Sequence, residues 1–232
     1  MNAKWKARFH FLWREWIRPL AVIALAVFSF RSAVADWNDV PTGSMKPTIM
    51  EGDRIFINKV AYDLKIPFTT MRVAQWSDPE RGDIVVFFAP TDGTRMVKRV
   101  IGLPGDRIEL VDNQVFVNGE SLAYSELDAW FMEQIPAAQR SSHFFAEEAL
   151  GETPHPMMIT PQLPAPRTSG PHVVPEGHFF MMGDNRDNSM DSRYYGAVER
   201  GRIVGRAKAV AFSFDPERSY WPRWGRFFKK LP

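Results

Sequence analysis

Two residues far apart in the sequence have the chemistry of a hydrolase's reactive pair. Ser44 lies in the stretch VPTGSMKPTI, residues 40–49, where Gly and Pro favour a loop that presents the hydroxyl. A serine becomes a nucleophile only beside a base, and a lysine can be that base when its amine is neutral. Lys98 is the candidate, because on a strand it shares a face with Met96 and Val100, and apolar burial lowers the pKa of a lysine. The alternatives are that Ser44 is a turn residue and that Lys98 is an edge-strand lysine facing water.

Histidine is the more usual base for a serine, but no histidine of this chain stands in a recognisable triad context, and no G-x-S-x-G elbow occurs. His172 and His178 flank VVPEG and have no obvious acidic partner. The five histidines are His10, His143, His155, His172 and His178.

A third polar segment, MGDNRDNSMDSRYYG at 182–196, combines carboxylates, amides and guanidinium groups. Calcium is the first interpretation, but the EF-hand template fails: counted from Asp187, the sixth residue is Ser192 instead of Gly and the twelfth is Val198 instead of Glu. A polar network that braces a turn fits better, with Ser189 offering a hydroxyl to a nearby amine. The charged and amide residues are Asp184, Asn185, Arg186, Asp187, Asn188, Asp191 and Arg193.

The element that precedes Ser44 is the one long apolar run of the chain, residues 19–37. As a helix it would be roughly 28 Å long at 1.5 Å per residue, close to the ~30 Å hydrocarbon core of a bilayer. Arg31 interrupts the run near one end, where its guanidinium can reach the headgroups. The flanking tryptophans, typical of membrane interfaces, are Trp13, Trp16 and Trp37.

The charge before this run predicts its orientation. Residues 1–18 hold five basic residues against one acidic residue, whereas the whole chain carries a formal net charge of only +2. By the positive-inside rule the N-terminus stays in the cytoplasm and residues 38–232 lie outside. A rival interpretation is a cleaved secretory signal, because AVA at 33–35 resembles an A-x-A cleavage site. We expect a retained anchor, because the tryptophans and basic residues flank the run as they flank a membrane span.

The remainder is predicted to be mainly β, in short strands that position Ser44 and Lys98. Asn-Gly in QVFVNGESL, 114–122, indicates a hairpin. Residues 121–171 differ: we interpret them as an insertion or cap, with a short helix at 125–135 and a Pro-rich irregular stretch at 153–171. Strand-like runs occupy 53–62, 83–90, 102–110, 178–184 and 201–214.

Composition excludes several classes of site and partner. Without cysteine there are no disulfides and no thiolate metal sites. With a small net charge and no basic stripe, a nucleic-acid partner is not predicted. No metal or cofactor is expected.

Taken together and in this order, the polar stretches resemble one family, the bacterial type I signal peptidases, which are membrane-bound serine proteases that remove signal peptides. The matching stretches are PTGSMKPTI (41–49), GDRIFINKVAY (52–62), RGDIVVF with MVKRVIGLPGD (within 81–106) and GDNRDNSMDSRYYG (183–196). They cover about a quarter of the chain.

The resemblance implies a role for each matching residue. Ser44 would be the nucleophile and Lys98 the general base. Ser189 would orient the lysine, and the Thr42 hydroxyl would join the Ser44 N–H in the oxyanion hole, where many relatives carry serine. The residues matching positions that brace the site by ion pairs are Asp184, Asp191, Arg99 and Arg193.

The resemblance also implies a fold and a setting. The fold would be an antiparallel β catalytic core with a variable β-rich cap within about 107–175, after a cytoplasmic segment 1–18 and one transmembrane helix at 19–37. The enzyme would sit in the bacterial cytoplasmic membrane and cut exported preproteins after A-x-A-like sites. Two alternatives stay open: a Ser–Lys peptidase with a narrower maturation task, and a non-catalytic, membrane-tethered β-domain that binds exported chains.

Overall fold

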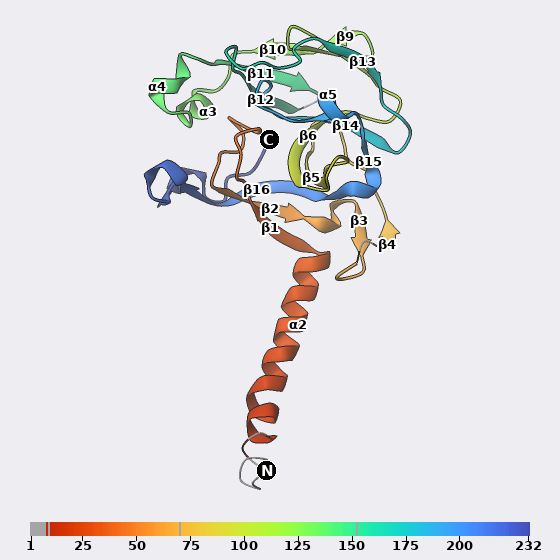
Figure 1. Ribbon diagram of the computed structural model, residues 1–232, viewed down its shortest axis with the longest axis vertical. Helices are drawn as coiled ribbons and strands as arrows, with labels where there is room; N and C mark the ends of the chain where they lie inside the picture. Colours follow the sequence, from red (N-terminus) through yellow and green to blue (C-terminus); the bar gives the residue numbers. More distant parts are fainter. Residues whose placement is uncertain (1–7, 9, 70, 152) are drawn as a thin grey trace.

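The computed structural model describes residues 8, 10–69, 71–151 and 153–232. A helical rod at the N-terminus projects from a β-rich body (Figure 1). The rod contains a π-helical turn, η1 (Trp13–Ile17), and the helix α2 (Arg18–Ala33). The 24 residues His10–Ala33 are long and apolar enough to cross a membrane. Much of the basic segment expected at 1–18 lies outside the described residues.

The helix ends before the apolar run does. The sequence suggested a helical anchor over 19–37, but α2 stops at Ala33 and strand β1 (Ala35–Asp39) starts two residues later. The cause is backbone pairing: the Lys59 N–H donates to the Val34 carbonyl at 2.9 Å, and β1 then pairs with the next strand of the body. The chain therefore passes from the rod directly into the sheet.

One antiparallel sheet forms the centre of the body. Its strand order is β1-β2-β16-β5-β6-β14-β15, and a short strand, β17, pairs with β16. The mainly antiparallel β fold with one preceding apolar helix, expected from the sequence, is confirmed. The remaining strands of this sheet are β2 (Asp53–Asn58), β5 (Ile84–Phe88), β6 (Arg95–Gly102), β14 (His178–Met182), β15 (Val198–Glu199), β16 (Ile203–Asp215) and β17 (Trp221–Pro222).

The central position of β5 follows from its sequence, IVVFF, which is apolar on both faces. Ile84 and Val86 pack into one buried cluster with Ile55, while Val85 and Phe87 pack into a second cluster. Such a continuous apolar run is typical of a strand covered on both sides. Strand β6, which carries Lys98, lies between β5 and β14 and is therefore held in register from both edges.

Two smaller sheets form a cap at the end of the body opposite α2 (Figure 1). The Asn118-Gly119 turn between β8 and β9 has positive φ at both residues, as a tight hairpin turn requires, so the predicted hairpin is confirmed. The cap strands are β7 (Arg107–Val111), β8 (Gln114–Val117), β9 (Glu120–Ser121) and β13 (Ser169–Val173) in one sheet, and β10 (Ala123–Ser125), β11 (Phe144–Leu150) and β12 (Thr153–Ile159) in the other.

The first half of the Pro-rich stretch, expected to be irregular, is strand β12, so that prediction was wrong. Pro154 and Pro156 are two residues apart, and their nitrogens therefore face the same edge of the strand. That edge is the outer edge of the three-stranded sheet, where no strand needs an N–H donor. The short helix expected within 125–135 is present as α3 (Ala129–Glu133).

Short elements complete the body. A hairpin of β3 and β4 lies beside the junction of α2 with the sheet (Figure 1). These elements are β3 (Asp63–Lys65), β4 (Arg72–Gln75), the helices α4 (Ala137–Arg140) and α5 (Ser192–Tyr195), and the 3-10 turns η2 (Lys59–Ala61), η3 (Arg200–Arg202), η4 (Pro216–Arg218) and η5 (Trp224–Arg226).

Candidate active site

The loop that carries Ser44 connects β1 to β2 and is anchored from two sides. Met45 and Ile49 on the loop are fully buried in the core, and the Ile49 N–H donates to the Met45 carbonyl at 2.9 Å. From the other side, Asn185 donates its backbone N–H to the Ser44 carbonyl and its side-chain amide to the Gly43 carbonyl, both at 3.1 Å. The hydroxyl is thus presented by a fixed backbone.

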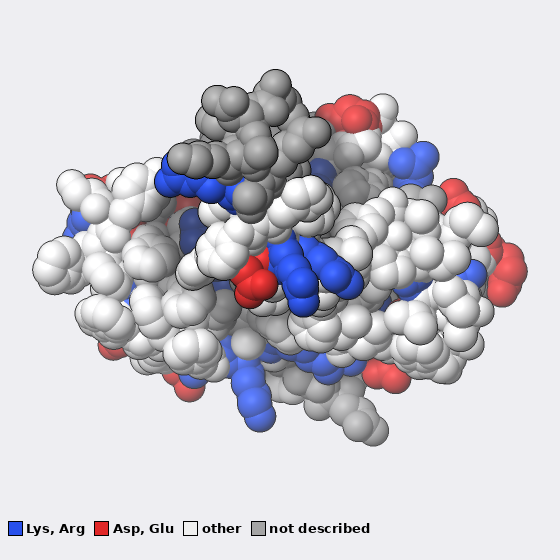
Figure 2. Space-filling view, turned by 90° about the horizontal axis from the view of Figure 1, so that it is seen from below, with Lys and Arg blue, Asp and Glu red and all other residues white. Residues whose placement is uncertain are grey.

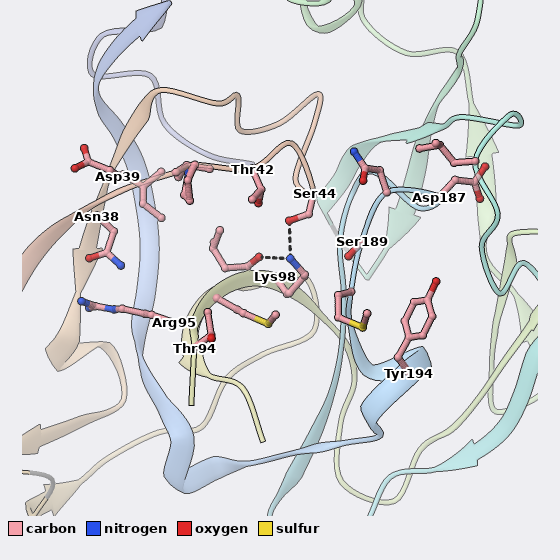
Figure 3. Close-up of a pocket in the computed structure, with 18 of the residues that line it drawn as sticks. Asn38, Asp39, Thr42, Ser44, Thr94, Arg95, Lys98, Asp187, Ser189 and Tyr194 are labelled. Atoms are coloured by element: carbon pink, nitrogen blue, oxygen red, sulfur yellow. Dashed lines mark hydrogen bonds between the residues drawn. The ribbon is translucent and has the colours of Figure 1, made fainter. Parts of the chain in front are cut away.

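Lys98 reaches that hydroxyl from strand β6. Its Nζ lies 2.6 Å from Ser44 Oγ and donates to the Val97 carbonyl at 3.1 Å (Figure 3). The two side chains come from positions 54 residues apart, and both are buried, with 8 % of Ser44 and 4 % of Lys98 exposed. This is the nucleophile-to-base distance that a serine hydrolase requires.

The surroundings of Lys98 favour a neutral amine. Burial lowers the pKa of Lys98 to about 8, against the opposing effect of the negative charges of Asp191 and Asp184. The positive charge of Arg193 lowers the pKa further. Among the described residues, no carboxylate forms an ion pair with Lys98 Nζ, so the amine can lose its proton near neutral pH.

Each nearby carboxylate is instead bound by an arginine. Asp184 accepts two hydrogen bonds from Arg99, at 2.9 and 2.8 Å. Asp191 accepts two from Arg193, both at 2.8 Å, and one from the Gly183 N–H at 3.1 Å. These are the four charged residues that the family resemblance singled out, and they fix the loop between β14 and α5 against the sheet.

A second buried network lies behind this loop and was missed by sequence reasoning. Arg186 binds Glu148 of cap strand β11 through two hydrogen bonds, at 3.0 and 2.5 Å. Tyr124 donates its hydroxyl to the same carboxylate at 2.7 Å, and the fully buried His155 lies 3.4 Å from it. Burial lowers the pKa of His155, so its ring is neutral there. Glu148 could not be identified from sequence, because its role depends on a partner 38 residues away.

Ser189 lies beside the pair without a bond to it. It is buried, but its Oγ makes no hydrogen bond with any described residue. Gly183 explains how it fits: a Cβ there would lie 2.3 Å from Ser189 Oγ and 2.4 Å from the Ser44 carbonyl oxygen, so only glycine allows the approach. Gly183 is a second functional position that sequence reasoning did not single out, although it lies in the polar segment.

Thr42 lies near Ser44 and is exposed at the wall of the cleft (Figure 3). No hydrogen bond from its hydroxyl is formed within the described part of the chain, and the Ser44 N–H likewise donates to no described group. Both donors are therefore free to bind an oxygen that enters the cleft.

The cleft that contains these groups has a volume of about 530 Å³. Its walls are formed by β1, by the start of β6 and by the polar loop, with Ile55, Met96 and Met190 supplying apolar surface. Within the described residues, no group of three or more His, Cys, Asp or Glu side chains could hold a metal ion. The chemistry available is that of a hydroxyl, an amine and neutral donors.

Comparison with known proteins assigns this chain to a family. The family model for signal peptidase, peptidase S26, matches residues 13–212. Signal peptidase I of Pseudomonas fluorescens is 38 % identical over 225 residues, covering 91 % of this chain and 77 % of the relative. Signal peptidase I of Pseudomonas aeruginosa is 36 % identical over 227 residues, with the same coverage. A crystal structure of signal peptidase I from Enterococcus faecalis is 34 % identical and covers 56 % of this chain and 97 % of its own, with a TM-score of 0.36. This chain therefore belongs to peptidase family S26, the signal peptidases.

Proposed function

We propose that this protein is a membrane-anchored serine endopeptidase that removes N-terminal signal peptides from exported preproteins after A-x-A-like sites. The observation that carries the proposal is the 2.6 Å contact between Lys98 Nζ and Ser44 Oγ on the floor of the cleft. Membership of the signal peptidase family supplies the class of substrate.

The reaction starts with neutral Lys98 taking the proton of Ser44 as Oγ attacks the carbonyl of the scissile bond. When the tetrahedral intermediate collapses, the Lys98 ammonium gives its proton to the leaving amine, and an acyl-enzyme remains on Ser44. Lys98 then takes a proton from a water molecule that attacks the ester and gives it to Ser44 Oγ as the acyl C–Oγ bond breaks, which releases the signal peptide and restores the neutral amine. One amine thus serves as base and acid in turn.

The oxyanion of each tetrahedral intermediate is bound by the Ser44 N–H and the Thr42 hydroxyl. Both donors are unoccupied and border the cleft, which is what an oxyanion hole requires. Thr42 differs from the serine of many relatives by one methyl group, which leaves the hydroxyl in place.

The remaining predicted residues act as positioning residues. The ion pairs Arg99–Asp184 and Arg193–Asp191 hold the polar loop, and Asn185 of that loop holds the Ser44 carbonyl. Ser189 lines the same cleft as Lys98, and its buried hydroxyl has no partner among the described residues, so it is the group we assign to orient the amine.

The proposed setting is the cytoplasmic membrane of a bacterium, with α2 as the single anchor. Residues 1–18 would face the cytoplasm and the body would face outside. Trp37 precedes Ser44 by seven residues, a reach of at most roughly 24 Å at ~3.5 Å per residue. Strand β1 leads from the helix end to the wall of the cleft. The cleft would then lie at the depth where a signal peptide's cleavage site leaves the bilayer.

The expected substrate binds in an extended form along the free edge of strand β1 or beside the first half of β6, which does not pair with β14, with small side chains in shallow apolar hollows of the cleft. This accounts for a preference for alanine at the first and third positions before the cut.

The test is cleavage of a purified preprotein by detergent-solubilised protein, wild type beside Ser44→Ala. We expect release of the signal peptide by the wild type and none by the variant. Equal cleavage by both would contradict the proposal. Binding of the preprotein by both proteins without cleavage would instead favour the non-catalytic tether.

A further inference from the structure

A second pocket, separate from the catalytic cleft, lies where the helical rod meets the body. Its volume is about 550 Å³, and Ser32 at the end of α2 forms part of its wall. The hairpin of β3 and β4 and the turn η3 form the other sides. The residues that line it are Ser32, Lys59, Lys65, Phe68, Thr69, Phe88, Arg95, Gly201, Arg202, Ile203 and Val204.

The lining of this pocket is cationic. Lys59, Lys65, Arg95 and Arg202 all contribute to it, and its lining contains no acidic residue. Four cations around one cavity repel one another unless an anion lies between them. A ligand with a concentrated negative charge would satisfy this arrangement.

The carboxylates closest to the pocket do not neutralise these cations one by one. Asp36 is shared by Arg31 at 2.8 Å, Lys59 at 3.3 Å and Arg95 at 3.9 Å. Asp63 is similarly shared by Lys65 and two arginines.

Arg202 forms no ion pair with any described carboxylate and donates only to the Ala89 carbonyl, at 3.2 Å. The pocket thus keeps a surplus of positive charge.

Its position relative to the membrane follows from the helix. Lys59 Nζ donates to the Arg31 and Ser32 carbonyls at 2.7 and 3.2 Å, so the pocket is tied to the last turn of α2. A 24-residue helix spans roughly 36 Å, enough for a ~30 Å hydrocarbon core to end just below Ala33. The exposed rings of Phe68 and Phe88 then border the pocket at the level of the glycerol groups.

Seen along the rod from its N-terminal end, most of the visible surface is uncharged, and the Lys and Arg side chains near its middle lie where the rod projects toward the viewer (Figure 2). The exposed Phe68 and Phe88 beside the cationic lining match the two parts of a phospholipid, its acyl chains and its phosphate.

We propose that this pocket binds the phosphate of an anionic phospholipid, with Lys65, Arg95 and Arg202 as its ligands, while Lys59 is held by the Arg31 and Ser32 carbonyls. The inference rests on the proposed membrane placement. Arg95 lines both this pocket and the catalytic cleft, so a bound lipid would also fix one wall of the cleft. A free phosphate or an acidic peptide offers similar charge without acyl chains, and the experiment separates them.

The experiment measures lipid retention by native mass spectrometry on the full chain carrying Ser44→Ala, so that no step depends on cleavage. Phosphatidylglycerol or phosphatidylcholine is titrated into the detergent-solubilised protein. We expect one retained phosphatidylglycerol and about fivefold weaker binding in Arg202→Gln or Lys65→Gln, since one interfacial cation contributes about 1 kcal/mol. Arg107→Gln, which removes an exposed charge from the cap, is the matched control and should bind like its parent.

Equal affinity in Arg202→Gln and Arg107→Gln would overturn the proposal, as would equal affinity for the two lipids. Displacement of the lipid by an equal concentration of inorganic phosphate, or of an acidic peptide, would assign the pocket to those anions and overturn the lipid assignment. Thermal unfolding of each variant shows that it is folded. The two proposals can fail separately. If the wild type cleaves preprotein but the chain retains no lipid, only this inference fails. If the chain retains the lipid but the wild type does not cleave, only the proposed function fails.

Discussion

The floor of the catalytic cleft and the underside of the body both bury cations, but they balance them differently. On the floor of the cleft, the two arginines near Lys98 each have a carboxylate of their own: Arg99 has Asp184 and Arg193 has Asp191. At the underside one carboxylate serves three cations, as Asp36 does. One-to-one pairing leaves Lys98 as an amine without a counterion, which favours its neutral form. Where one carboxylate is shared by several cations, positive charge remains that an anionic ligand can neutralise.

The largest effect should come from giving the cleft a permanent cation. Lys98→Arg keeps a positive charge that cannot be lost in a protein, and Lys98→Ala removes the base. We expect both to reduce kcat/KM for preprotein cleavage by at least about 10³-fold while the protein stays folded, since the proton of Ser44 then has no acceptor. Cleavage assays with thermal unfolding as the control check this, and near-normal turnover by Lys98→Arg would refute the lysine base.

Breaking a one-to-one pair should cost more stability than removing a surplus cation. Arg186→Met leaves the buried Glu148 carboxylate unpaired, and we expect the free energy of unfolding to fall by about 3–5 kcal/mol. Arg202→Met, the same substitution at the underside, should change it by no more than about 0.5 kcal/mol. Urea unfolding of the solubilised proteins measures the free energy of unfolding of both variants. Similar decreases in the two variants would show that the two regions balance their cations in the same way.

Thr42 should contribute to kcat through its hydroxyl group alone. Thr42→Val keeps the shape of the exposed side chain and removes the donor, so we expect kcat to fall by about 10²–10³. Thr42→Ser should keep most of the activity. If Val and wild type turned over at the same rate, Thr42 would not belong to the oxyanion hole.

The last prediction is that no change occurs: we expect the chain to remain uncleaved after AVA, residues 33–35. A membrane helix over 19–37 would have kept this site helical and so protected it, but Ala35 lies in β1, so helical structure is not what protects it. Protection comes instead from pairing with β2 and from the ion pairs of Asp36, which hold the segment in place. N-terminal sequencing of membrane-purified protein should find the full-length chain, and Asp36 as the main N-terminus would identify a cleaved signal.

The sequence indicated most residues of the candidate site because they lie in four compact polar stretches. Ser44 and Lys98, 54 residues apart in sequence, are in contact, as the resemblance required. The network around Glu148 and the cationic pocket could not be predicted from the sequence. Their residues are scattered along the chain, and only the folded structure brings them together and buries them. The Pro-rich strand β12 was missed because edge position, a tertiary property, decides whether proline is tolerated.

The end of the membrane helix was misplaced for a related reason. Apolar character continues to Trp37, but the backbone of 35–39 is taken up by pairing with β2. Hydropathy measures affinity for lipid and carries no information on competition from a neighbouring strand.

The central claim is that Lys98 acts as a neutral amine made available by burial. The most direct test is the pH dependence of kcat/KM for preprotein cleavage by the wild type, which reports the free enzyme. Because the pKa of Lys98 is lowered to about 8, the neutral fraction rises as pH passes through that value. We expect kcat/KM to increase from pH 6 and to level off above about pH 8. A rate already maximal at pH 6, or one that rises only near the ordinary lysine pKa, would contradict it.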